Sequence, residues 1–286
     1  MKIKRKKSKK KLVIIVFVLL VIIASFASWN YFFNDSEVPV SSVENKINST
    51  TQTQTIEEAK PTFNNAKIKK ALKTWVASHG GTYSVTITDG SGKAIAQTNE
   101  NQSYFAASIY KLYVAYIGYQ KVDDGTYSSA EPYLYGWTRG ECLREMIRQS
   151  HSPCAEKMWN ELGKENLTNK LKEYGLKDTS MTGLATSSRD VAIILANINN
   201  GVDLSKKSQT AFLESMKKQI YRDALPVGFN ESVVYDKVGF NEQLEYHDVA
   251  IIKLADGRKL IVSVLTTGVG SRNIAGLGSA LQTSAQ

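Results

Sequence analysis

The feature that most constrains this chain is an uninterrupted apolar run close to its N-terminus, from Leu12 to Trp29. Among these eighteen residues only Ser25 and Ser28 are polar. A helix of about eighteen residues rises about 27 Å, which is close to the hydrocarbon thickness of a bilayer. The run therefore predicts one transmembrane helix, which we place within residues 12–33.

The charges on either side of the run predict its orientation. Eight Lys and Arg residues lie within positions 1–11, whereas Asp35 and Glu37 follow the run. Lys and Arg mark the cytoplasmic side, so residues 1–11 are predicted to form a cytoplasmic tail. A cleaved signal peptide is the alternative, since residues 24–28 include small side chains that a peptidase accepts. The length of the run favours a retained, single-pass signal-anchor in the cell membrane, with the C-terminal domain extracytoplasmic.

The net charge of +9 is concentrated in the tail. Without the first eleven residues, 28 basic residues face 27 acidic ones. A body so close to neutral offers no broad surface for phosphate groups, so we exclude nucleic acid as a partner.

Residues 34–65 have the composition of a linker. They are mostly Ser, Thr, Asn, Gln and Glu, with few large apolar side chains. Such a segment cannot bury enough surface to offset its ordering entropy, so we predict a flexible polar stalk. The remaining residues, 66–286, have the length of a single domain, which we expect to be a monomer.

Hydrophobic periodicity in this body predicts an α+β fold. Apolar residues at helical spacing between Ile68 and Val76 predict a first helix, and a hairpin of residues 84–88 with 93–97 follows. Helical segments dominate from Ser108 to about Lys218, and strands at 249–254 and 260–266 close the chain. We therefore expect one antiparallel sheet, built from both termini of the domain and packed against a helical subdomain.

The two cysteines, Cys142 and Cys154, lie twelve residues apart. They could pair in an oxidising compartment, but the spacing does not settle their geometry. We favour the alternative of two small, buried, unpaired side chains. Neither their spacing nor the positions of the histidines and carboxylates indicates a metal site.

One short segment combines a nucleophile with a possible base. Ser108-Ile-Tyr-Lys111 begins a helix, and residues three apart share a helix face, so the amine of Lys111 can reach the hydroxyl of Ser108. Burial would lower the pKa of the lysine and let it accept a proton. The predicted helix is amphipathic, with a buried stripe of Ile109, Leu112, Tyr113, Tyr116 and Ile117.

The spacing alone is weak evidence for catalysis. The same spacing occurs at Ser8 with Lys11 and at Ser215 with Lys218, where we assign it no role. A helix-capping serine beside a solvated lysine is the plain alternative for Ser108.

Further motifs follow in a defined order. The segment Asn101-Gln-Ser-Tyr-Phe-Ala-Ala-Ser-Ile-Tyr-Lys111 comes after the hairpin, Ser150-His-Ser152 comes after a helix, and Asp236-Lys-Val-Gly239 lies on a strand. This ordered set resembles that of the class A β-lactamases and of their relatives among the penicillin-binding D,D-peptidases. The resemblance covers about Lys67 to Gly270.

The resemblance implies a serine hydrolase that forms an acyl-enzyme with a β-lactam or a D-Ala–D-Ala-type cell-wall peptide, without a cofactor. Ser108 would be acylated, Lys111 would accept its proton, and Ser150 would pass a proton onward. Lys237 would supply positive charge for a substrate carboxylate. Ser152, Gly239 and Phe240 would contact the substrate, and the backbone N–H groups of Ser108 and Phe240 would form an oxyanion hole.

The chain also departs from the family pattern. His151, Ser152 and Val238 replace the family's Asp, Asn and Thr, and the segment between Gly175 and Arg189 is too short for a full omega loop and contains no glutamate. Glu242 or Glu245 could replace the missing deacylation base, although a solvated turn is the simpler interpretation. We expect weak β-lactam turnover; the alternative is a catalytically inactive wall-binding module on the same fold.

Overall fold

The computed structural model describes residues 62–286. The predicted cytoplasmic tail, the predicted transmembrane helix and most of the predicted stalk lie outside this range. Within residues 62–286, no helix combines the length and the apolar character that crossing a membrane requires. The anchor therefore stays a prediction from sequence.

The first described residues already belong to the folded domain. Asn64 caps helix α2 (Asn65–Ser78) by accepting a hydrogen bond from the backbone N of Lys67 at 3.1 Å. Phe63 packs against the apolar core, and the guanidinium of Arg258 lies 4.7 Å from the centre of its ring. One aromatic side chain in a polar stretch thus attaches the end of the predicted stalk to the domain.

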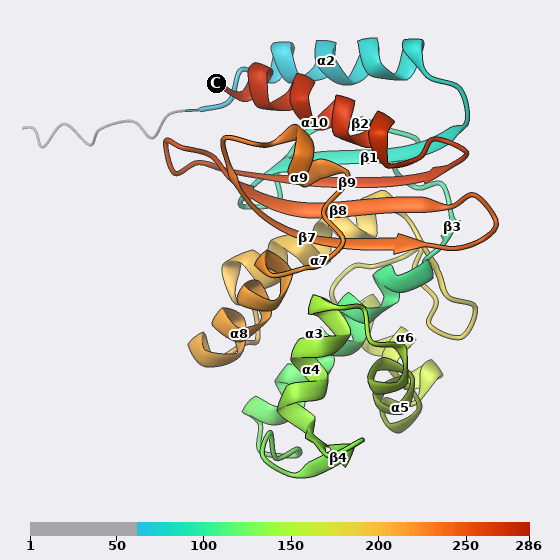
Figure 1. Ribbon diagram of the computed structural model, residues 1–286, viewed down its shortest axis with the longest axis vertical. Helices are drawn as coiled ribbons and strands as arrows, with labels where there is room; N and C mark the ends of the chain where they lie inside the picture. The colour runs from blue at the N-terminus through green and yellow to red at the C-terminus, as the bar shows by residue number, and fades with distance from the viewer. Residues whose placement is uncertain (1–61) are drawn as a thin grey trace, which may run out of the picture. The chain divides into compact units, whose positions relative to one another are not determined.

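A five-stranded antiparallel sheet forms the centre of the domain, with the strand order β2-β1-β9-β8-β7 (Figure 1). Its strands are β1 (Thr82–Asp89), β2 (Ala94–Thr98), β7 (Val233–Phe240), β8 (Tyr246–Lys253) and β9 (Lys259–Thr267). β1 pairs with β9 along its whole length. The prediction of one sheet built from both ends of the domain is therefore confirmed.

Both faces of this sheet are buried, so its inner strands are almost continuously apolar. Along β8, Val249 and Ile251 enter the core shared with the helical subdomain, whereas Ala250 and Ile252 enter the core beneath the outer helices. The outer layer consists of α2, α9 (Leu225–Gly228) and α10 (Ser271–Ala285) (Figure 1). Trp75 ties this layer together, since its indole N–H donates to the carbonyl of Asn273 at 2.8 Å.

The helical subdomain lies on the other face of the sheet (Figure 1). Its helices are α3 (Tyr110–Asp123), α4 (Arg139–Arg148), α5 (Ser152–Leu162), α6 (Lys164–Glu173), α7 (Ser188–Asn200) and α8 (Lys206–Lys217). Two small sheets complete it: β3 (Tyr104–Phe105) pairs with β6 (Ala185–Thr186), and β4 (Pro132–Leu134) pairs with β5 (Trp137–Thr138). The α+β class and the antiparallel sheet beside a helical subdomain are as predicted.

Helix α3 differs from its prediction. Instead of burying one stripe, it is buried on every side from Tyr110 to Tyr119, because α4, α5, α6, α7 and α8 all pack around it. The hydroxyl groups of two of its buried tyrosines are hydrogen-bonded within the core. Tyr113 Oη forms a hydrogen bond with Thr186 Oγ1 at 2.6 Å, and Tyr116 Oη donates to the carbonyl of Val202 at 2.7 Å. The prediction of an amphipathic helix was wrong because the hydroxyl groups of these buried tyrosines find hydrogen-bond partners inside the core.

Candidate active site

Ser108 lies in a short 3-10 turn, η1 (Ala107–Ile109), which leads directly into α3. The residue before it, Ala107, has φ +42°, a left-handed conformation that costs a non-glycine residue on the order of 1–3 kcal/mol. The surrounding structure holds this turn in place: β3 pairs with β6, and Ala106 N donates to the carbonyl of Leu184 at 2.6 Å. The chain thus positions Ser108 at the start of a rigid, buried helix.

Lys111 lies one turn further on and is buried, with only 1% of its surface exposed. Its Nζ donates to the carbonyl of Ser150 at 2.6 Å, to Ser152 Oγ at 2.9 Å and to Ser150 Oγ at 3.2 Å. Burial lowers its pKa from the ordinary 10.5 to about 8, although the carboxylate of Glu156 acts in the opposite direction. A substantial fraction of this amine is therefore neutral near physiological pH.

Lys237 approaches the same hydroxyl group from the sheet. It lies on β7 and is fully buried, and its Nζ is 3.1 Å from Ser150 Oγ and 2.5 Å from the carbonyl of Val238. Burial and then the charge of Lys111 lower its pKa to about 7, against the opposing effect of Asp236 and Asp248. Ser150 Oγ thus lies between two amines that α3 and the edge strand of the sheet supply.

The contact predicted between Ser108 and Lys111 is not a direct hydrogen bond. Among residues 62–286, Ser108 Oγ forms no hydrogen bond with either amine, whereas both amines reach Ser150 Oγ. In enzymes without bound substrate such contacts are often long and shorten when substrate binds. The structure therefore gathers Lys111, Ser150, Ser152 and Lys237 into one hydrogen-bonded cluster, with Ser108 beside it on the same helical segment.

Gly239 lets strand β7 lie close to η1, the turn that contains Ser108. A Cβ atom at this position would lie 3.1 Å from the backbone N atoms of both Ser108 and Ile109, closer than ordinary van der Waals contact. The next residue, Phe240, ends the strand with its side chain 48% exposed, and its ring lies 5.5 Å from that of Tyr221. Gly239 thus lies beside Ser108, and Phe240 follows it at the exposed end of β7.

Replacing Gly239 by alanine is expected to slow acylation of Ser108 about tenfold, because a shift of the β7 strand or the η1 turn by a few tenths of an ångström misplaces the reacting groups. The matched control is Gly276→Ala on α10, where a Cβ meets no atom within 4 Å. Stopped-flow acylation rates would show the difference. Equal rates for the two variants would mean that the close contact at Gly239 is unimportant.

The Ser150-His-Ser152 turn joins α4 to α5. Ser150 has φ +56°, again left-handed, and His151 caps α5 by accepting a hydrogen bond through Nδ1 from Cys154 N at 3.3 Å. The ring of His151 lies 4.9 Å from that of Trp137. The residue that replaces the family's aspartate is thus a helix cap packed on an aromatic ring.

Two buried carboxyl groups, those of Asp236 on β7 and Asp248 on β8, had no functional role assigned from the sequence. Asp236 accepts a hydrogen bond from Arg222 Nη1 at 2.6 Å, and Asp248 accepts one from Leu225 N at 2.8 Å. Burial raises the pKa of Asp236 to about 7 in spite of Arg222 and Lys237. Burial, and then the charge of Asp236, raises the pKa of Asp248 well above its usual range. The sequence indicated them only in that each is an acidic residue within a strand whose other residues are largely those of a buried strand.

The shortened loop runs beside the strand that leads to Ser108, where β6 pairs with β3. Its acid, Asp178, accepts a hydrogen bond from Ser187 Oγ at 3.2 Å and lies 4.0 Å from the guanidinium of Arg189. Glu242 is exposed in the turn between β7 and β8, and Glu245 is bonded there to Asn241. Asp178 and Glu245 thus have local hydrogen-bond partners, and Glu242 is exposed.

No cluster of three or more His, Cys, Asp or Glu side chains suited to a metal ion occurs among the described residues. The candidate site consists instead of hydroxyl groups, amines and backbone N–H groups. Such a set can carry out acyl transfer, in which a nucleophile, a base and a proton relay are required.

The same fold occurs in solved structures of PBP-A and of class A β-lactamases. A mutant of PBP-A in an acyl-enzyme complex with penicillin G matches with a TM-score of 0.69 and 19% identity, over 78% of this chain and 97% of its own. The putative class A β-lactamase PenP from Rhodopseudomonas palustris matches with a TM-score of 0.69 and 20% identity, over 76% and 99% of the two chains. A class A β-lactamase from Bacteroides cellulosilyticus matches with a TM-score of 0.68 and 15% identity, over 78% and 99%.

These likenesses define the class: a protein with the fold of the class A β-lactamases and PBP-A. A search of curated protein sequences found no match. The model of the beta-lactamase enzyme family matches residues 67–281. The chain therefore belongs to the beta-lactamase enzyme family, and the family resemblance inferred from the motifs is confirmed.

Proposed function

We propose that this protein is a serine acyl-transfer enzyme, anchored by its N-terminal segment to the outer face of the cell membrane. Its substrates would be D-Ala–D-Ala-type cell-wall peptides or β-lactams. The observation that carries the proposal is the position of Ser150 Oγ, which is 3.2 Å from Lys111 Nζ and 3.1 Å from Lys237 Nζ. Burying two amines around one hydroxyl group costs stability. In acyl transfer the same arrangement supplies a base, a proton relay and a positive charge, which accounts for a cluster that is unfavourable for stability.

In the proposed reaction the hydroxyl oxygen of Ser108 attacks the substrate carbonyl carbon, and an ester forms as the C–N bond breaks. Neutral Lys111 accepts the proton of Ser108, directly or through Ser150. Ser150 delivers a proton to the leaving nitrogen. Charged Lys237 binds the substrate carboxylate, and the backbone N–H groups of Ser108 and Phe240 stabilise the oxyanion, an interaction worth about 3 kcal/mol per donor.

The lowered pKa values of the two lysines make the neutral form of either amine accessible near neutral pH. Their pKa values are lowered to about 8 for Lys111 and about 7 for Lys237, mainly by burial, and the charge of Lys111 contributes to the lowering at Lys237. Two amines coupled in this way titrate as a pair, so near neutral pH they carry between them about one or two positive charges. The reactive form of the pair has one proton, held by Lys237, with Lys111 neutral. Because Lys111 has the higher pKa, this is the minor singly protonated form in the free protein, and a substrate carboxylate bound beside Lys237 favours it.

We propose that the acyl-enzyme hydrolyses slowly. The segment between Gly175 and Arg189 lacks a glutamate, and its acid, Asp178, is engaged by Ser187 and Arg189. Without a positioned base, water attacks the ester slowly.

With the chromogenic β-lactam nitrocefin, the full-length protein is expected to give a burst of about one hydrolysed molecule per enzyme and little further turnover. The measurement is the absorbance trace at several enzyme concentrations. Sustained turnover after the burst would show that another group supplies the deacylation base, and would contradict the proposal of slow hydrolysis.

Labelling with a fluorescent penicillin tests the proposed function itself. The full-length protein in detergent is expected to be labelled covalently, and Ser108→Ala is expected to abolish the label. Ser215→Ala is the matched control, because Ser215 has the same spacing to a lysine but donates its hydroxyl to the carbonyl of Ala211 at 2.8 Å. Labelling of Ser108→Ala, or none of the wild type, would refute the proposal.

A wall-binding module without catalysis is the second candidate. It is motivated by Ser152 and Val238, which replace the side chains with which the family grips its substrate. Peptidoglycan pull-down distinguishes the two: retained binding by Ser108→Ala, together with no labelling of the wild type, would favour the binding module.

A further inference from the structure

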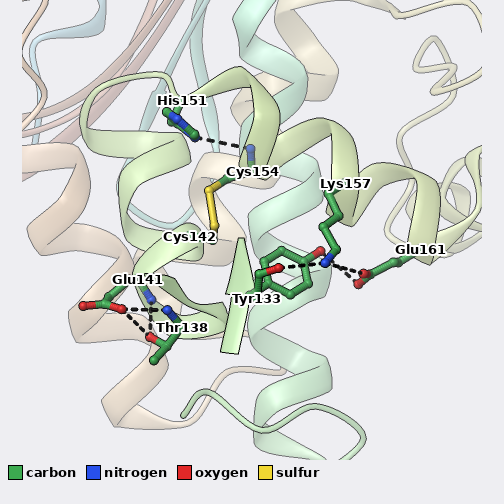
Figure 2. Close-up of a disulfide and its surroundings, with 8 residues drawn as sticks. All are labelled: Tyr133, Thr138, Glu141, Cys142, His151, Cys154, Lys157 and Glu161. Atoms are coloured by element: carbon green, nitrogen blue, oxygen red, sulfur yellow. Dashed lines mark hydrogen bonds and ion pairs between the residues drawn. A yellow bond between two sulfur atoms is a disulfide. The ribbon is translucent and has the colours of Figure 1, made fainter. Parts of the chain in front are cut away.

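A disulfide joins the two helices on either side of the Ser150 turn. Cys142 in α4 and Cys154 in the first turn of α5 are bonded, and both are fully buried (Figure 2). The expectation of two unpaired cysteines is therefore wrong in pairing and right in burial. The bond closes the segment that contains Ser150, His151 and Ser152.

The turn inside this closed segment is strained. Ser150 has φ +56°, a conformation that a residue with a side chain rarely adopts and that persists only where its surroundings impose it. On the α4 side, the carbonyl of Glu145 accepts from Gln149 N and from His151 N at 3.1 and 3.2 Å. On the α5 side, Cys154 N donates to Nδ1 of the capping residue His151, so Cys154 is held both by the cap and by the disulfide (Figure 2).

The strained turn presents three oxygen atoms to Lys111. The carbonyl of Ser150, Ser150 Oγ and Ser152 Oγ all lie within 3.2 Å of its Nζ. The two hydroxyl groups come from opposite sides of the α4–α5 junction, because Ser150 follows α4 and Ser152 is the first residue of α5. Their convergence on one amine requires a fixed angle between the two helices.

We infer that the Cys142–Cys154 disulfide is a positioning device for Ser150 and Ser152, holding α4 and α5 at the angle at which both hydroxyl groups reach Lys111. The inference rests on the proposed function for its role in acyl transfer. It deepens that function by adding a covalent element to the hydrogen-bonded cluster. Helix α4 also packs against α3, α5 and α8, and Gln219 Nε2, just after α8, donates to the carbonyl of Ile147 at 3.1 Å; the disulfide is the covalent link between α4 and α5.

The test compares the wild type with a Cys142→Ala/Cys154→Ala variant, both full-length in detergent. Without the disulfide, α5 moves relative to α4 and water reaches Lys111. Because burial is the main cause of its lowered pKa, that pKa should rise from about 8 by at least about one unit toward 10.5. An NMR titration of the lysine side chains, with Lys111 assigned through Lys111→Arg, measures this rise without any substrate.

The kinetic readout follows from the same change. A rise of one unit leaves about tenfold less neutral amine below pH 8, so acylation by penicillin at pH 7 should slow about tenfold, with the pH profile displaced to higher pH. Leu277→Ala on α10 is the matched control: it removes a fully buried side chain from the other face of the sheet. It should lower thermal stability while leaving the pKa of Lys111 and the pH profile unchanged.

Each outcome decides the inference. A folded variant that keeps both the wild-type pKa of Lys111 and the wild-type acylation profile would overturn it. If the double variant does not fold, the same titration is made on wild-type protein reduced and alkylated in the cold, with an untreated sample as reference. If no protein is acylated at all, the proposed function fails, while the titration still decides whether the disulfide positions the cluster.

Discussion

Replacing Lys111 by arginine is expected to slow acylation of Ser108 about 10²- to 10⁴-fold, the range that general acid–base catalysis contributes in enzymes. Arginine keeps the positive charge, but its guanidinium does not lose a proton below about pH 12. It can remain beside Ser150 and Ser152 without accepting the proton of Ser108. The loss would therefore measure proton transfer separately from charge.

The control for this variant is Lys218→Arg. Lys218 also follows a serine by three residues, but its side chain is 67% exposed and pairs with Glu214. Its replacement should leave the acylation rate unchanged. Circular dichroism would establish that both variants fold, and stopped-flow kinetics would supply the rates. A folded Lys111→Arg protein that reacts at the wild-type rate would remove Lys111 from the role of base.

Replacing Asp248 by asparagine is expected to stabilise the folded protein above pH 7 by on the order of 2 kcal/mol. In the β7–β8 register Asp236 pairs with Ala250 and Val238 pairs with Asp248, so the two acids are diagonal neighbours on one face. Among the described residues, Asp236 Oδ2 and Asp248 Oδ1 are buried without a hydrogen-bond partner. An amide at position 248 removes one of the two charges and keeps the acceptor for Leu225 N.

The pH dependence has a defined sign. The pKa of Asp236 is raised to about 7 in the folded state, whereas an aspartate in an unfolded chain has a pKa of about 3.9. Protonation of the pair therefore stabilises the fold fully below about pH 4, and this stabilisation is lost as the pH rises through about 7. Urea unfolding of both proteins at pH 5 and pH 8 should show a smaller loss for Asp248→Asn. An equal or larger loss would contradict this account of the pair.

The sequence predicted the fold well where the pattern of burial is simple. Strands buried on both faces, such as β8 and β9, appear as continuous apolar runs, and the first helix has its apolar residues at helical spacing. The prediction failed for α3, where tyrosine hydroxyl groups satisfied inside the core imitate a polar face. Patterning cannot distinguish a solvated polar group from one with a buried partner.

The residues of the candidate site could be proposed from the sequence, but the residues that surround and position them could not. Ser108, Lys111, Ser150 and Lys237 lie in short motifs at the ends or edges of elements, where the order of elements brings them together. Arg222 and Asp248, by contrast, reach Asp236 from separate segments with no motif of their own. The disulfide was not predictable for a related reason: a separation of twelve residues says nothing about the angle between α4 and α5.

Intact-mass spectrometry of the full-length protein after incubation with penicillin G, followed by peptide mapping and a time course, tests the central claim most directly. The account predicts one added penicillin per chain, on the peptide that contains Ser108, and a slow loss of this adduct. The absence of an adduct, or an adduct on any other residue, would contradict the claim that Ser108 is the acylated nucleophile.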